Sequence, residues 1–213
     1  MKVLTMFILL LPFVFVNAQK IGELAPDRPP EVFPNNTWGV DIMFGDGGFG
    51  LGTFYRRAFT DNITGFIDFS ISEGKDEREI QYIDYFGNTY TPNKVNRAFL
   101  MPVNFGMLYR LFPEALTENL RPYLTFGIGP TLIVTTPYEQ DFFSAFGDAK
   151  AHIAVGGYIG FGANIGISKS NLVGLNARYY YNRIIGSGIE LMTKSNRKDF
   201  GQFTIMLTIG IMY

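Results

Sequence analysis

Apolar side chains alternate with polar or small ones along most of this chain, from residue 37 to the last residue. The alternation is cleanest in the final stretch, QFTIMLTIGIMY, which covers residues 202–213. There Ile205, Leu207 and Ile209 share one face, while the other face carries glutamine, threonine, methionine and glycine. Because successive side chains of a β-strand point to opposite faces, this pattern predicts strands with one apolar and one mixed face.

Eight segments carry this alternation and predict an all-β protein, which the aromatic share of 16% and the 24 glycines also favour. The expected strands cover residues 37–45, 49–59, 63–72, 97–111, 121–135, 151–168, 173–182 and 202–213. Connections after the second, fourth and sixth strands are short, whereas those after the third, fifth and seventh are long. Short turns at one end and long loops at the other are typical of transmembrane β-barrels.

A soluble β-sandwich or a soluble barrel would also alternate, but it would turn its apolar face inward and its polar face to water. The mixed faces of this chain combine glycine and asparagine with a few charges. They are poor in lysine and glutamate, which keep the exposed face of a soluble protein in solution. We therefore expect an antiparallel, eight-stranded, up-and-down transmembrane β-barrel over residues 37–213.

Charged residues of the mixed faces are expected to point into the lumen of this barrel. They are Asp41, Arg56, Asp68, Arg110 and Arg178. An eight-stranded barrel has a lumen just wide enough to be filled by side chains, and buried charges need partners. The sequence thus predicts an ion-paired plug, and a narrow channel is the alternative. Remaining donors and acceptors are expected to be satisfied by Asn104, Asn164, Asn176, Tyr123, Tyr158 and Tyr180.

The first 36 residues are expected to lie outside the barrel. Residues 1–18 have the layout of a secretory signal peptide, because Lys2 precedes an apolar run that is too short for a spanning helix of roughly 20 residues. Residues 19–36 are rich in proline and predict an extended periplasmic lead-in. The chain has no cysteine and a net charge of -1, which excludes thiolate chemistry and argues against a nucleic-acid partner. No cofactor and no metal are expected.

The last residues, TIGIMY, complete a family resemblance that also rests on the signal peptide, the even number of strands and their alternation. On these features the chain resembles the small eight-stranded outer-membrane β-barrel proteins of Gram-negative-type bacteria. Such proteins end in an aromatic residue preceded by apolar residues at alternate positions, and Tyr213, Ile211 and Ile209 match this signal. The resemblance implies an outer-membrane protein in contact with lipid, whose last strand is recognised by the barrel-assembly machinery.

Some barrels that resemble this one are acyltransferases or deacylases of lipid A, which use a histidine, a serine and an acidic residue at the outer rim. His152 is the one histidine of the chain, and Asp148 and Ser144 lie near it in the sequence. The His-x-Ser spacing of the deacylases is absent, because Ala154 stands at that place. We therefore expect a non-enzymatic role in envelope structure or surface interaction, with a lipid-modifying hydrolase or acyltransferase as the alternative.

The stretch GDGGFG, residues 45–50, matches the G-x-G-x-x-G pattern of loops that bind a dinucleotide. A nucleotide-binding loop must lead into a helix, whose N-terminus holds the phosphates, but here another alternating strand follows. We therefore expect a hairpin with a type I′ turn at Asp46 and Gly47, rather than a nucleotide site.

Residues 77–95 alternate weakly around residues 86–88 and predict a second hairpin beyond the membrane. Its edge and its aromatic side chains are candidates for binding a surface partner by strand addition. Aromatic residues near the strand ends are expected to form the interfacial girdles of the barrel. These are Trp38, Phe44, Tyr55, Phe59, Phe99, Tyr109, Tyr181 and Tyr213.

Overall fold

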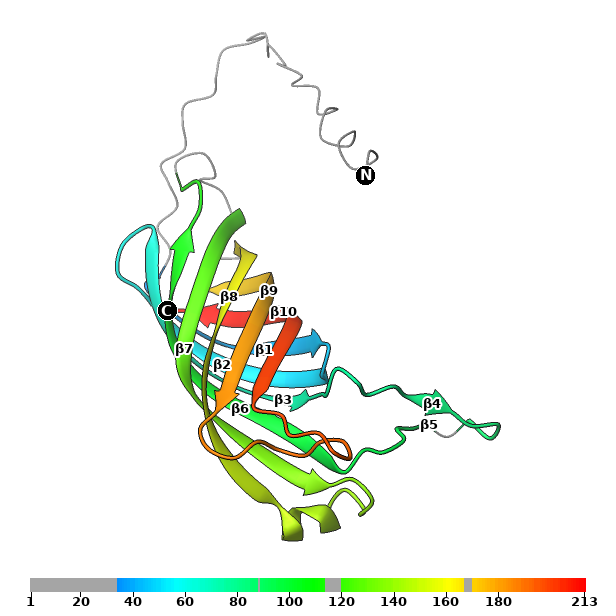
Figure 1. Cartoon of the computed structure of the whole chain (residues 1–213). Helices are drawn as coiled ribbons and strands as arrows, with labels where there is room; N and C mark the ends of the chain where they lie inside the picture. The colour runs from blue at the N-terminus through cyan, green and yellow to red at the C-terminus, as the bar shows by residue number, and fades with distance from the viewer. Residues whose placement is uncertain (1–33, 88, 114–119, 167–169) are drawn as a thin grey trace, which may run out of the picture.

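Eight antiparallel strands close into a barrel in the computed structural model of the chain, which describes residues 34–87, 89–113, 120–166 and 170–213 (Figure 1). The barrel strands are β1 (Asn36–Gly45), β2 (Gly48–Ala58), β3 (Ile63–Gly74), β6 (Asn96–Arg110), β7 (Leu120–Pro137), β8 (Lys150–Gly166), β9 (Asn171–Ile184) and β10 (Asp199–Met212). Their order around the barrel is β1-β10-β9-β8-β7-β6-β3-β2. Consecutive strands pair and β10 closes on β1, which confirms the expected up-and-down topology.

Two smaller elements lie outside the barrel wall. Strands β4 (Tyr82–Ile83) and β5 (Thr89–Tyr90) form a hairpin that projects away from the barrel (Figure 1). The 3-10 helix η1 (Ser144–Asp148) lies between β7 and β8. No helix in the described part of the chain is long and apolar enough to cross a membrane. The expected signal peptide (residues 1–18) and most of the expected lead-in (residues 19–36) lie outside the described residues.

The barrel has a turn end and a loop end, as the lengths of the connections predicted. At the turn end lie the connections β2–β3, β6–β7 and β8–β9, together with the start of β1 and the end of β10. At the loop end lie the short β1–β2 hairpin and the long connections β3–β6, β7–β8 and β9–β10. At this end β7 extends two residues further than expected, to Pro137, and β8 begins one residue earlier, at Lys150, because Pro137 pairs with Asn96 of β6 and Lys150 pairs with Thr135 of β7.

An uninterrupted apolar belt covers the outside of the barrel. Side chains such as Ile128, Ile159 and Phe161 are 65%, 67% and 65% exposed, and every barrel strand contributes large apolar residues to this surface. Leaving such a surface in water costs roughly 25 cal/mol per Å² relative to burial, and a monomer in water rarely exposes so large a patch. The expected orientation of β10 is confirmed, since Ile205, Leu207 and Ile209 all face outward.

Charged side chains mark the two borders of the apolar belt. Within the described strands, the charged residues at outward-facing positions are Arg57 at the turn end and Glu73, Arg97, Arg183 and Asp199 at the loop end. Arg183 and Asp199 form an exposed ion pair at 3.3 Å. The belt between these borders therefore carries no charge on its outer face, as a lipid-facing surface requires.

The β1–β2 hairpin differs from the expected type I′ turn at Asp46 and Gly47. The positive φ falls one residue later, on Gly48, at 115°. Asp46 keeps two hydrogen bonds to Phe203 of β10: its amide donates to the carbonyl at 3.1 Å, and its carboxylate accepts from the amide at 3.0 Å. Asp46 thus stays bonded to β10 with a negative φ, and the positive φ falls on Gly48, the first residue of β2 after the two-residue loop. The type I′ prediction is wrong.

Candidate functional site: a closed lumen beneath an outer loop surface

The centre of the lumen is built around the guanidinium group of Arg178, which is 4% exposed. Its Nη1 lies 2.9 Å from Oδ2 of Asp68, and its Nη2 lies 3.9 Å from Oδ2 of Asp41. Asp68 also accepts hydrogen bonds from the Tyr158 hydroxyl at 2.8 Å and from Nδ2 of Asn104 at 3.0 Å. These residues come from five different strands, so the ion pair ties opposite walls of the barrel together.

Hydrogen bonds satisfy the rest of this buried cluster. The Nε of Arg178 donates to Asn176 at 3.1 Å, and its Nη1 donates to the Tyr180 hydroxyl at 3.0 Å. Asn176 donates to Thr208 at 3.1 Å, and Thr208 in turn donates to Asp41. A buried charge is tolerated only when it is paired and its remaining donors are bonded, and this network meets that requirement.

The predicted lumen charges therefore divide into a central group and outlying residues. Asp41, Asp68 and Arg178 come together, whereas Arg56 places its guanidinium 4.0 Å from the centre of the Phe54 ring. Such a cation–π contact partly replaces a carboxylate partner. Arg110 lies half-buried at the turn end of β6. The sequence identified the charged residues, but it contained no signal that predicts which arginine pairs with the two aspartates.

Aromatic rings and glycines fill the lumen beside this network. The rings of Phe66 and Tyr158 stack at 6.0 Å, and those of Tyr158 and Tyr180 lie 4.8 Å apart. Phe66 occupies the space that a side chain at Gly106 would need, since a Cβ there would lie 2.4 Å from the ring. Towards the loop end, the remaining gap leaves no room for a water molecule. It is lined by Met43, Ser70, Ser72, Leu100, Pro102, Tyr180, Asn182 and Gln202.

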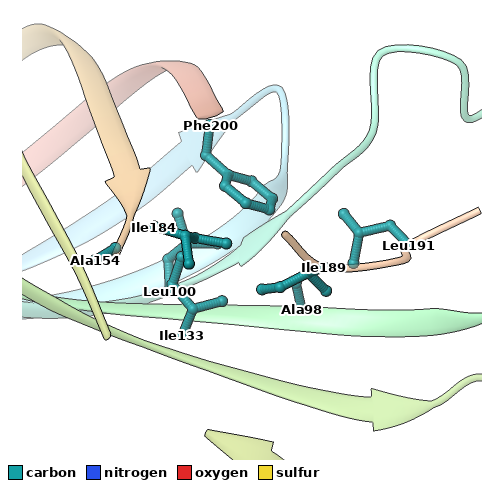
Figure 2. Close-up of a cluster of buried hydrophobic side chains, with 8 residues drawn as sticks. All are labelled: Ala98, Leu100, Ile133, Ala154, Ile184, Ile189, Leu191 and Phe200. Atoms are coloured by element: carbon teal, nitrogen blue, oxygen red, sulfur yellow. The ribbon is translucent and has the colours of Figure 1, made fainter. Parts of the chain in front are cut away.

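An apolar cluster closes the lumen at the loop end (Figure 2). Barrel strands supply most of its members, and the β9–β10 loop adds Ile189 and Leu191, which are 3% and 0% exposed. The cluster consists of Ala98, Leu100, Ile133, Ala154, Ile184, Ile189, Leu191 and Phe200. The two loop residues therefore fold inward over the barrel mouth. Sequence reasoning missed them because they lie in a stretch without strand periodicity.

The β3–β6 and β9–β10 connections clasp each other above the mouth through Asp76, which is 2% exposed. Burial would raise the pKa of this carboxyl. Hydrogen bonds from the Arg78 side chain, from Ser195 and from the Arg78 amide, together with the charge of Arg197, outweigh burial and lower the pKa of Asp76 to about 2. The Ser195 hydroxyl donates to Asp76 at 2.7 Å, across 119 residues of sequence.

A second ion-pair cluster lies within the β3–β6 connection and the adjoining end of β3, and backbone bonds join this connection to the β9–β10 connection. The buried Nζ of Lys94 lies 2.8 Å from Glu79 and 3.4 Å from Glu73. The amide of Val95 donates to the carbonyl of Leu191 at 2.8 Å, so the two loops share backbone hydrogen bonds as well. The loop end is therefore one organised structure.

The β4–β5 hairpin projects from this structure and carries exposed aromatic and apolar side chains (Figure 1). Tyr82 and Tyr90 stack across the two short strands at 5.9 Å, and Tyr85 and Phe86 at the tip contact each other edge to face at 5.8 Å. Tyr85 is 98% exposed and Phe86 is 86% exposed. The hairpin predicted within residues 77–95 is therefore present, with its aromatic side chains in the open.

The candidate catalytic residues have separate hydrogen-bond partners. His152 lies 3.5 Å from the hydroxyl of Thr135, and Asp148 accepts a hydrogen bond from Gln140 at 2.8 Å. Ser144 begins the helix η1. Within the described residues, no hydrogen bond joins His152, Ser144 and Asp148 to one another, and no group of acidic or histidine residues could hold a metal ion. A hydrolase would need His152 in contact with Ser144, and Asp148 in contact with His152 to orient it as the base.

Similarity to known proteins is confined to solved structures, since no protein-family model and no curated protein matches the chain. The attachment invasion locus protein Ail of Yersinia pestis is 14% identical, with a TM-score of 0.43 over 83% of this chain and 95% of that one. Neisserial surface protein A is 14% identical, with a TM-score of 0.46 over 84% and 94%. The N-terminal β-barrel domain of Pseudomonas aeruginosa OprF is 15% identical, with a TM-score of 0.43 over 84% and 97%.

Proposed function

We propose that this chain is an integral outer-membrane β-barrel without catalytic activity, which acts through the surface formed by its outer loops. The observation that carries the proposal is the inverted distribution of side chains. Apolar residues such as Ile205 and Leu207 face outward, whereas Asp41, Asp68 and Arg178 are buried in the lumen. Lipid is the solvent that favours this arrangement, because it stabilises the apolar belt and the barrel closure leaves no strand edge unpaired.

A structural and binding role is supported over a channel by the way the lumen is filled. The ion pair of Arg178 and Asp68 spans the middle of the lumen, and the apolar cluster with Ile189 and Leu191 covers its loop end. An ion entering from the loop end would have to cross both. What the protein offers to its surroundings is therefore its lipid-facing belt and its loop surface.

Assembly of the barrel is proposed to use the end of β10. Ile209, Ile211 and Tyr213 are 45%, 49% and 61% exposed and point to the same side, away from the lumen. An alternating apolar face that ends in an aromatic residue is thus accessible to barrel-assembly machinery before β10 closes on β1.

The β4–β5 hairpin is the proposed binding surface for a partner protein. Its exposed aromatic residues are mainly tyrosines, which combine apolar rings with hydroxyl groups and are enriched at protein–protein interfaces. The hairpin also has free strand edges that can accept another strand. Placed beyond the charged border of the apolar belt, it faces water rather than lipid.

Membrane fractionation tests the proposed location. We expect the chain in the outer-membrane fraction, with a gel band that shifts on boiling because a closed barrel resists detergent at room temperature. A freely soluble periplasmic product would overturn the proposal.

Photo-crosslinking in intact cells tests the proposed binding surface. A photoreactive residue at Tyr85 is expected to give a discrete protein adduct, whereas the same residue at Tyr179, in the apolar belt, is not. Equal adducts from both positions, or none from Tyr85, would argue against a partner at the hairpin.

A further inference from the structure

The loop between β7 and β8, residues 138–149, carries a compact cluster of phenylalanines at the surface. Phe142, Phe143 and Phe146 are 48%, 86% and 44% exposed. The ring centres of Phe142 and Phe143 lie 5.3 Å apart, and those of Phe142 and Phe146 lie 5.4 Å apart. Three clustered aromatic rings without a polar atom form an exposed apolar patch, and such patches mark sites of contact with a protein or a membrane.

This cluster continues the apolar belt of the barrel. The Phe99 ring lies 6.1 Å from Phe142 and stacks with Phe146 at 5.9 Å. Phe99 faces outward from β6 and is the last apolar residue on that face before the charged border at Arg97. The loop therefore bends back against the outside of the barrel at the level where the belt ends.

Several bonds hold the loop in this position. Arg97 donates from Nη1 to the backbone carbonyls of Pro137 at 3.1 Å and Gln140 at 3.2 Å. The Gln140 side chain donates to Asp148 at 2.8 Å, which links the two ends of the loop. Ala145, in the middle of the loop, is fully buried. The phenylalanines are thus presented by an ordered segment.

We propose that the β7–β8 loop is a membrane-contacting segment, in which Phe142, Phe143 and Phe146 lie among the acyl chains at the outer boundary of the bilayer. This inference rests on the proposed membrane location of the barrel. Phenylalanine has no polar group that must reach water, so acyl chains suit it better than a hydrated protein interface does. The acidic residues Asp141 and Asp148 flank the cluster in sequence without interrupting it, and can remain at the headgroup level.

The contrast with the β4–β5 hairpin strengthens this assignment. Of aromatic side chains, the hairpin exposes three tyrosines and one phenylalanine, whereas the loop exposes phenylalanines alone. The hairpin projects away from the barrel, and the loop packs on the belt (Figure 1). If the β7–β8 loop contacts lipid, the surface that remains for a partner protein is formed by the hairpin and by the β9–β10 loop, which is bonded to the β3–β6 connection.

Fluorescence quenching by brominated lipid tests the inference on the full chain. Trp38, the single tryptophan, is first replaced by phenylalanine, and one tryptophan is then introduced by Phe143→Trp, Phe86→Trp or Phe126→Trp. Phe143 and Phe86 are both 86% exposed, which makes them a matched pair, and Phe126 lies in the middle of the belt. Each variant is reconstituted in phosphatidylcholine vesicles whose acyl chains carry bromine either near the headgroup or near the chain middle.

We expect Phe143→Trp to lose most of its fluorescence with shallow bromines, Phe126→Trp with deep ones, and Phe86→Trp with neither. If Phe126→Trp is quenched and Phe143→Trp is not, the assignment of the loop to lipid would be wrong, while the membrane location of the barrel would be supported. Absence of quenching in all three would overturn the proposed membrane location as well. Equal quenching of Phe143→Trp and Phe86→Trp would contradict the distinction between a lipid-facing loop and a water-facing hairpin.

Discussion

Removing the carboxylate of Asp68 is expected to be among the most damaging single substitutions in the lumen. Asp68 is the close partner of Arg178 and also accepts bonds from Tyr158 and Asn104. Asp68→Ala leaves the guanidinium group of Arg178 buried, with the carboxylate of Asp41 at 3.9 Å as its remaining counter-charge. Two further donors lose their acceptor at the same time.

The expected loss follows from the geometry. Breaking a buried ion pair by removing one partner costs about 3–5 kcal/mol, because the other charge stays desolvated. The second carboxylate keeps part of the pairing, so we expect the lower end, about 3 kcal/mol. Asp41→Ala removes a longer contact and the bond from Thr208, and should cost about 1–2 kcal/mol.

Denaturant unfolding of the reconstituted barrel measures these values, with the gel shift and the fluorescence of Trp38 as independent signals. The losses of Asp68→Ala and Arg178→Met should not add, because both remove the same ion pair. Because the double variant leaves Asp41 buried without a counter-charge, recovery of stability needs Asp41→Asn as well. A loss below about 0.5 kcal/mol for Asp68→Ala, which is the range of ordinary surface substitutions, would show that this ion pair does not stabilise the lumen. Equal losses for the two aspartates, or no coupling with Arg178→Met, would contradict its predicted role too.

Three further outcomes are expected. The depressed pKa of Asp76, about 2 against an ordinary 3.8, means that its stabilisation is present above pH 4 and is lost as the pH falls towards 2. Pepsin should therefore cleave the loops of the wild type more slowly than those of Asp76→Asn at pH 4, and this difference should vanish towards pH 2. Gly106→Ala should destabilise the barrel by about 1–3 kcal/mol because its Cβ would collide with the backbone carbonyl of Phe126 and with the Phe66 ring. Gly147→Ala, where the space is open, should leave the unfolding midpoint unchanged. His152→Ala should leave the mass spectrum of cellular lipid A as it is in the wild type. A change in the acylation of lipid A would support the alternative of a lipid-modifying hydrolase or acyltransferase.

The sequence was sufficient for those features that depend on local periodicity. Strand positions, the outward face of β10 and the inward placement of Asp68 and Arg178 all follow from the period-two alternation. The projecting hairpin within residues 77–95 was also expected, because its turn residues are local signals.

Features that depend on the closure of the barrel could not be predicted from the sequence. Asp68 on β3 meets Arg178 on β9 across 110 residues, and which opposite-wall positions face each other depends on the stagger of all eight strands. Ile189 and Leu191 lie outside any strand, so their burial in the mouth is a tertiary effect. The β1–β2 turn was misplaced because the bonds from Asp46 to β10, a distant strand, decide where the positive φ falls.

We propose that lipid covers the apolar face of each strand while the lumen excludes it, and spin labelling along β10 is the most direct test. The chain has no cysteine, so single cysteines can be introduced at successive positions from Thr204 to Ile209 and labelled in vesicles. We expect that oxygen, which concentrates in lipid, reaches the labels at Ile205, Leu207 and Ile209 and not those between them. Access of a water-soluble nickel reagent to those same three positions would contradict it.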